Sequence, residues 1–165
     1  MIISIPRVIN AARALIGAIP NPKSNESASI RNHIKEPSVT DDRGLDYMRN
    51  IFRADLDPFV AYMDANWPDL RTLVCTFIYG YWQSDVSIID AITTSQLNIA
   101  TLMAMDAPPE VVWHMRGLIR NGGTREQLQF ATDIAMEICQ LTNVQLKNQM
   151  PLPEDVINEE RLIRV

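Results

Sequence analysis

The sequence predicts an all-α protein, and three observations support this fold class. Hydrophobic residues make up 47% of the 165 residues, whereas aromatic residues make up only 7%. The chain holds eight methionines and just six glycines, a composition that favours helices over a sheet sandwich. Apolar residues recur at steps of three and four, which is the spacing of one helix face. A chain of this length buries about two-thirds of its unfolded surface and needs neither disulfides nor metal to hold a core.

The charge and the cysteines narrow the possible partners. The net charge is −5, and no run of Lys and Arg with interleaved aromatics would follow a phosphate backbone, so we expect no nucleic acid partner. No apolar run approaches the roughly 18–20 residues that span a bilayer, so we expect no membrane partner. Cys75 and Cys139 lie in separate apolar stretches without a CxxC pattern, which is typical of buried free thiols in a reducing, cytoplasmic setting.

The first 23 residues predict a basic amphipathic helix. They contain no acidic residue and three basic ones, Arg7, Arg13 and Lys23. An ordinary first helix is the favoured interpretation. A mitochondrial presequence is the alternative, which Pro6 and the scarcity of serine weaken.

Residues 21–42 are rich in Ser, Asn, Pro and charge and show no sustained apolar period. We therefore expect a surface arm here, so that residues 1–42 form an N-terminal helix and arm. His33 falls in this arm, where a solvated side chain is the simplest interpretation.

Three helices are expected next. Apolar residues give a helical face that starts near Arg43: Leu45, Met48, Ile51 and Phe52. A short helix is predicted over 58–66. Pro68 suits the first position of a third helix that runs to Trp82, because the first amides of a helix have no partner within it.

The fourth helix is predicted over Val86–Met105. It is apolar around most of its circumference, with a polar interruption at residues 93–98. Such a helix is normally buried in the centre of a bundle or covered by another subunit. The pattern agrees with a homo-oligomer, which we expect, and equally with a central position in the bundle.

The fifth and sixth helices have clear boundaries. Pro108 begins the fifth helix, and Gly122 provides a left-handed stop after it. Thr124 and Gln127 form a capping box that begins the sixth helix, which fades near Asn143. Residues 43–150 thus form the predicted helical domain. The prolines at 151 and 153 predict a non-helical C-terminal tail over 151–165.

Glu110 and His114 are the candidate catalytic residues. Four residues apart on a helix, they share one face, which continues to Gly117 and Asn121. His114 could move a proton near neutral pH while Glu110 fixes its tautomer. The structural alternative is an exposed ion pair worth about 0.3–0.5 kcal/mol, with Gly117 allowing a close helix crossing.

Trp113, Arg116 and Arg120 occupy the neighbouring stripe of the fifth helix. Either arginine could hold a substrate carboxylate, but pairing with acids on an adjacent helix is the favoured alternative. The aromatic residues Tyr79, Tyr81 and Trp82 fit core or interface positions better than pocket walls. No metal site is expected, because two distant histidines and no cysteine cluster cannot assemble one.

The run EVVWHMRGLIRNGGTREQL resembles a segment of carboxymuconolactone decarboxylase-like proteins, with His114, Gly122, Thr124 and Glu126 at the matching positions. The preceding SQLNIATLMAM resembles a core helix of that family, although Gln96 stands where an acid is expected. The likeness covers residues 86–143. Related alkylhydroperoxidase D-like proteins use a Cys-x-x-Cys before the histidine, and both positions lack cysteine here, so dithiol peroxidase chemistry is not available.

The resemblance implies an alkylhydroperoxidase D-like helical bundle that assembles into trimers or hexamers. It implies a cofactor-free lyase-type enzyme that decarboxylates or isomerises a small acidic or lactone-type substrate by proton transfer through His114 and Glu110. The expected substrate-binding residues are Arg116, Arg120, Trp113, Gln96 and Asn121. The alternative is a non-catalytic assembly or partner-binding protein that retains the fold, which Gln96 and the missing cysteines favour.

Overall fold

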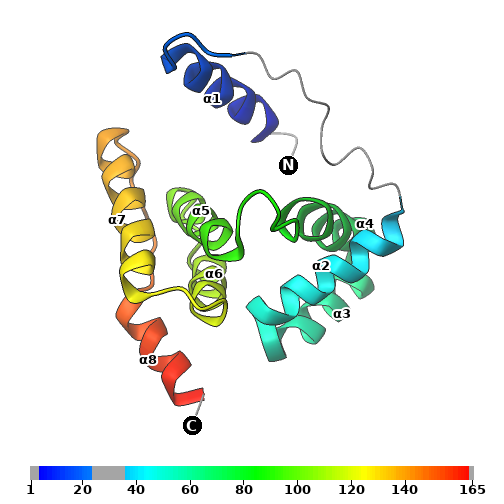
Figure 1. Ribbon diagram of the computed structural model, residues 1–165. Helices are drawn as coiled ribbons and strands as arrows, with labels where there is room; N and C mark the ends of the chain where they lie inside the picture. Colours follow the sequence, from blue (N-terminus) through cyan, green and yellow to red (C-terminus); the bar gives the residue numbers. More distant parts are fainter. Residues whose placement is uncertain (1–3, 24–35, 164–165) are drawn as a thin grey trace. The chain divides into compact units, whose positions relative to one another are not determined.

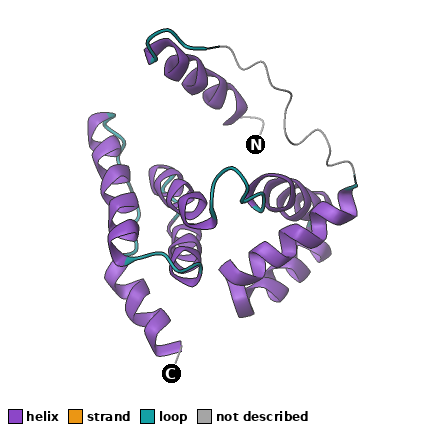
Figure 2. Ribbon diagram, viewed as in Figure 1, coloured by secondary structure: helices purple, strands orange, loops and turns teal. Residues whose placement is uncertain are grey.

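The computed structural model describes residues 4–23 and 36–163. The chain divides into two compact units, residues 1–33 and residues 34–165. Every regular element within the described ranges is a helix (Figure 2). The predicted all-α fold class is therefore confirmed. No helix in those ranges is long and apolar enough to cross a membrane.

The first unit contains helix α1, which spans Ser4–Ala18. This helix lies within the segment whose sequence predicts a basic amphipathic helix. Every residue of the segment 6–23 is exposed. His33 lies outside the described residues.

The second unit begins with α2 (Pro37–Phe52), followed by the short 3-10 helix η2 (Arg53–Asp55) and α3 (Leu56–Asn66). The surface arm was predicted to extend too far, because residues 37–42 already belong to α2. Pro37 occupies the first turn of this helix, where a proline fits without loss of a hydrogen bond. Tertiary packing explains the early start, since Thr40 is buried.

Helix α4 (Pro68–Arg71) leads directly into η3, a π-helix over Thr72–Gln83. The sequence predicted one helix over this range but not its wider turns. Backbone atoms of α2 and η3 lie in contact, because a Cβ added to Gly80 would stand 1.9 Å from the Thr40 carbonyl oxygen. π-Helices are rare, and their usual form, a single wide turn within an α-helix, is often found at functional sites. Here η3 carries Tyr79 and Gln83.

Helix α5 spans Ala91–Ala104, so it begins later than the predicted Val86. Asp90 caps it by accepting a hydrogen bond from the Thr93 amide at 2.7 Å. Helix α6 spans Pro108–Arg120 as expected. Helix α7 spans Arg125–Leu141 and starts with the predicted capping box of Thr124 and Gln127.

The prediction of a non-helical C-terminal tail is wrong, because Pro153–Ile163 forms helix α8. Proline suits the first turn of a helix as well as the end of one, and here Pro153 begins α8. Val156 and Ile157 are buried against α6 and α7. The burial of these two side chains stabilises a helix that local sequence signals do not identify.

The second unit holds two clusters of buried apolar residues. One lies among α5, α6, α7 and α8, and the other lies among α2, α3 and η3. Figure 1 shows α5 and α6 between α7 with α8 on one side and α2 with α3 on the other. Helix α6 contributes Met115 to the first cluster and packs Trp113 against the second. This position places His114 where the two clusters meet.

Candidate functional site

A cavity of about 320 Å³ opens beside His114. This volume is in the range of small-molecule sites. Its wall is formed by apolar and aromatic side chains with a few polar groups: Phe52, Phe59, Val74, Ile78, Tyr79, Gln83, Asn98, Thr101, Leu102, Glu110, Trp113 and His114. The cavity is therefore mostly apolar, with a minority of polar groups in its wall.

His114 is 5% exposed and is held on both ring nitrogens. The Tyr79 Oη atom lies 3.3 Å from His114 Nε2. The Asn98 Nδ2 atom lies 3.3 Å from His114 Nδ1 and donates to the Gln83 Oε1 atom at 3.0 Å. The π-helix η3, α5 and α6 thus each supply part of one hydrogen-bond network.

The placement of the Asn98 amide nitrogen beside His114 Nδ1 assigns the tautomer of His114. The Asn98 Nδ2 group can only donate, so His114 Nδ1 accepts and the ring proton is on Nε2. The Nε2–H group then donates to the Tyr79 oxygen. The hydroxyl hydrogen of Tyr79, which lines the cavity, is left to be offered to a ligand.

The ionisation states fit this arrangement. Burial lowers the pKa of His114 to about 4, so the ring is neutral at pH 7. Burial, and secondarily the nearby Tyr47, Cys75 and Glu110, raises the pKa of Tyr79 far above its usual value. Both groups are therefore uncharged, and Tyr79 acts as a neutral hydrogen-bond donor.

Glu110 lines the same cavity but is exposed. Glu110 was expected to orient the His114 imidazole. The hydrogen bonds of His114 go to Tyr79 and Asn98 instead. The charge of Glu110 does act on Tyr79, where it contributes to the raised pKa. The structure thus gathers Glu110, Trp113 and His114 of the predicted site at one cavity.

Three aromatic rings form the apolar wall. The ring of Phe52 lies 4.9 Å from that of Trp113 and 5.5 Å from that of Phe59, measured between centroids. The rings of Phe59 and Trp113 are 5.7 Å apart and meet edge to face. Such contacts hold aromatic side chains in fixed positions, so the wall is preorganised for a flat or apolar ligand.

The two candidate arginines lie elsewhere. Arg116 pairs with Glu159 at 2.9 Å. Arg120, 5% exposed, donates two hydrogen bonds to the Glu160 carboxylate at 3.0 and 2.6 Å. Neither arginine is part of the cavity wall. The alternative interpretation, in which they pair with acids on an adjacent helix, describes both of them.

Gln96 and Asn121 also lie outside the cavity wall. The Gln96 amide donates to the Gln127 carbonyl at 2.9 Å, and the Asn121 amide donates to the Gly117 carbonyl at 2.8 Å. A Cβ added to Gly117 would lie 3.1 Å from the Ile51 side chain. Gly117 therefore allows α2 to cross α6 closely, as the structural alternative predicted.

Sequence reasoning missed Tyr79, Asn98 and Gln83 as members of the site. Tyr79 was expected in the core or an interface, and it is indeed buried, but its hydroxyl bonds to His114. The available signal was the polar interruption within the apolar fourth helix. Asn98 belongs to that polar interruption, and its side chain contacts His114.

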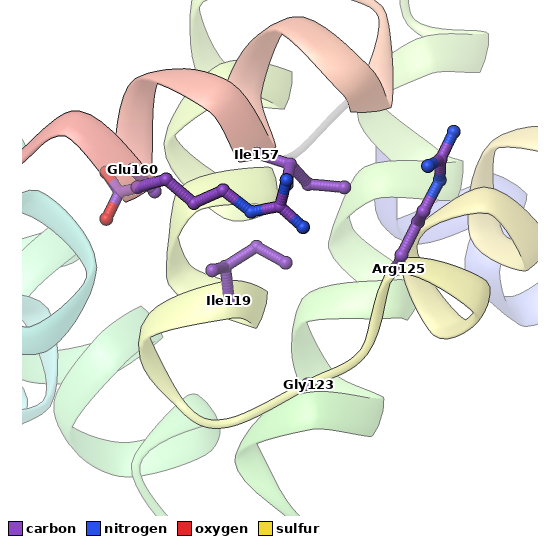
Figure 3. A pocket seen from close by; sticks show the side chains of 6 residues that line it. Ile119, Gly123, Arg125, Ile157 and Glu160 are labelled. Atoms are coloured by element: carbon purple, nitrogen blue, oxygen red, sulfur yellow. The ribbon is translucent and has the colours of Figure 1, made fainter.

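A smaller pocket of about 190 Å³ lies beside α8 (Figure 3). Ile157 of α8 lies across it from Ile119, Glu160 lies at one edge, and Arg125 lies at the other. Two of its charged groups are paired, since Glu160 binds Arg120 and Arg125 binds Glu154. The His114 cavity is larger and offers an unused donor, so it is the better candidate site.

The predicted buried free thiols are confirmed at Cys75 and Cys139. Burial raises the pKa of the Cys75 thiol to about 11, which leaves little thiolate at neutral pH. Within the described ranges, no three His, Cys, Asp or Glu side chains are grouped in a way that could hold a metal ion.

The chain is similar to two proteins named Peroxisomal protein 2. The one from Schizosaccharomyces pombe is 27% identical over 149 residues, which cover 90% of this chain and 68% of that protein. The one from Saccharomyces cerevisiae is 26% identical over 127 residues, which cover 75% of this chain and 45% of that protein. No protein-family model matches the chain, and no solved structure matches it.

The assignment to the carboxymuconolactone decarboxylase-like family is therefore wrong. No model of that family matches the chain, and the relatives found carry the name Peroxisomal protein 2. The short matching run reflects local features that many helical proteins share: a glycine stop at Gly122, a capping box at Thr124 and a histidine on the preceding helix.

Proposed function

We propose that this protein binds a small, uncharged and mostly apolar carbonyl compound beside His114 and promotes proton transfer next to the carbonyl group. The observation that supports this proposal is the Tyr79–His114–Asn98 network at the wall of an apolar cavity. It aims one neutral donor at a site that also borders a carboxylate, Glu110.

The chemistry follows from these two groups. Removal of a proton from the carbon beside a carbonyl places negative charge on the carbonyl oxygen, and the Tyr79 hydroxyl stabilises that charge by donating to it. Glu110 accepts the proton from carbon. Return of the proton to a different carbon isomerises the substrate and restores Glu110. A phenol donor and a carboxylate base in an apolar site are a known combination for this reaction class.

His114 has a positioning role in this scheme. Its Nε2–H group donates to the Tyr79 oxygen and so orients the hydroxyl hydrogen toward the ligand. This differs from the sequence-based hypothesis, in which His114 itself carries the proton. With its pKa lowered to about 4 and its Nδ1 lone pair occupied by Asn98, the imidazole is a weak base.

The substrate is proposed to be neutral rather than acidic. Among the residues that the structure describes, no arginine or lysine lines the cavity, and the one charged side chain in its wall, Glu110, repels a carboxylate. Arg116 and Arg120, which were expected to bind an anionic substrate, are paired with Glu159 and Glu160. Of the two expected substrate classes, a lactone-type compound fits this wall.

We place the protein in peroxisomes rather than in the cytoplasm or mitochondria. Both relatives are named peroxisomal proteins, and the chain aligns with the Schizosaccharomyces pombe protein over most of its own length. The chain spans under half of the Saccharomyces cerevisiae relative.

The test measures ligand binding by the cavity and the exchange of ligand hydrogens with solvent. Thermal shift with a panel of uncharged lactones and cyclic ketones, each beside its carboxylated counterpart, identifies ligands of the cavity. Proton NMR in D₂O then measures exchange of the hydrogens beside the carbonyl. Tyr79→Phe and Glu110→Gln are each expected to slow exchange by about 10²-fold or more, the scale of oxyanion and acid–base contributions.

Tyr62→Phe is the matched control, because Tyr62 is an exposed tyrosine that meets Trp67 edge to face and does not line the cavity. Its exchange rate should equal that of the wild type. Binding of carboxylated compounds in preference to neutral ones, or unchanged exchange in Tyr79→Phe, would contradict the proposal.

A second candidate function is binding without turnover. The neutral state of His114 favours it, because an uncharged hydrogen-bond network suits ligand retention as well as catalysis. Saturable binding of a neutral ligand with no exchange above the buffer rate would support this candidate over the enzyme.

A further inference from the structure

Helix α1 carries an exposed apolar stripe. Val8 is 65% exposed, Ile9 46%, Leu15 64% and Ile16 53%. With about 100° between successive residues, these four and Ala12 fall within an arc of about 120° on one face of the helix. A continuous stripe of exposed apolar side chains marks a surface that another protein or a membrane covers.

The rest of the helix is polar or small. Arg7 and Arg13 fall on opposite sides of the stripe, and Asn10, Ala14 and Gly17 fill the face between them. The first 23 residues contain no acid. Arginines at both borders can keep their guanidinium groups at a polar boundary while their stems lie along the apolar stripe.

The net charge of this part of the chain opposes that of the remainder. Residues 1–33 contain four basic residues and one acidic residue, which gives +3. The remaining 11 basic and 19 acidic residues of the total 15 and 20 give −8. Positive charge is thus concentrated in residues 1–33, which contain α1. The net charge of this segment complements an anionic surface, whereas that of the remainder does not.

We propose that α1 binds the surface of an anionic lipid membrane, with its Val8–Ile16 stripe in the interface and Arg7 and Arg13 at the headgroups. The stripe is purely aliphatic and lacks the aromatic anchors that protein interfaces favour. A basic amphipathic helix lying flat uses this combination of apolar burial and charge attraction. The expectation of no membrane partner rested on spanning length, which a helix in the interface does not need.

The experiment measures co-sedimentation of the full chain with vesicles of phosphatidylcholine alone and of phosphatidylcholine with phosphatidylserine. The wild type is expected to bind only the anionic vesicles, and less as salt is raised. Arg7→Gln/Arg13→Gln should weaken binding about 30-fold, since each basic residue at such a surface contributes about 1 kcal/mol and 1.4 kcal/mol is a factor of ten.

Leu15→Ser/Ile16→Ser should abolish binding by removing half of the apolar stripe. Asn10→Ser on the opposite face is the matched control and should bind as the wild type does. Equal binding to both vesicle types, or no binding by the wild type at low salt, overturns the proposal. A wild-type oligomer that Leu15→Ser/Ile16→Ser dissociates, without vesicle binding, would show that a second copy covers the stripe instead.

Discussion

Acid should destabilise this protein through His114. In the folded chain burial lowers the pKa of His114 from 6.5 to about 4. The unfolded chain, where the imidazole has its ordinary pKa, therefore binds a proton at higher pH than the folded chain does. The free energy of unfolding falls as the pH is lowered from about 6.5 to about 4.

The size of the effect follows from the two values. The difference between 6.5 and about 4, at 1.36 kcal/mol for each pH unit, corresponds to about 3 kcal/mol. This is a large part of the 5–15 kcal/mol that typically stabilises a domain. Urea titrations at half-unit steps from pH 7.5 to pH 4 measure it directly.

His114→Gln provides the comparison. Glutamine keeps a polar side chain of similar size but does not titrate, so its free energy of unfolding should lose about 3 kcal/mol less than the wild type over the same pH range. Titrations that the two proteins share cancel in the difference between the curves. Parallel curves for the two proteins would refute the argument that a buried neutral imidazole links stability to pH.

Three further predictions concern packing and assembly. Glu160→Gln should lower the free energy of unfolding by about 3–5 kcal/mol in urea titrations, because it leaves the buried Arg120 guanidinium uncompensated; a loss below 1 kcal/mol would contradict this. Gly80→Ala should destabilise the α2–η3 crossing enough to lower Tm by several degrees, since its Cβ would stand 1.9 Å from the Thr40 carbonyl oxygen; an unchanged Tm would argue against backbone contact. Light scattering should show at least three chains of 18.7 kDa, with the exposed apolar residues of the predicted helix 86–105 near the contact; a monodisperse monomer would rule this out.

The sequence by itself determined the helical fold class and most helix boundaries. Pro108, Gly122 and Thr124 act on the backbone within a few residues of themselves, through a fixed φ, a positive φ and a side-chain cap. Such signals are local, and so α6 and α7 begin and end where the pattern predicts. The periodicity of apolar residues is equally local, and it predicted the face of α2 on which Met48, Ile51 and Phe52 are buried.

Only the tertiary structure decided which polar groups meet. Tyr79, Asn98 and His114 come from three different helices, and their hydrogen bonds depend on how α5 and η3 pack against α6. The spacing of Glu110 and His114 predicts that both lie on one face of α6. It does not predict that Tyr79, rather than Glu110, hydrogen-bonds the imidazole. Helix α8 also depends on tertiary packing. Its own sequence signals do not identify it, and the burial of its apolar side chains against α6 and α7 makes residues 153–163 helical.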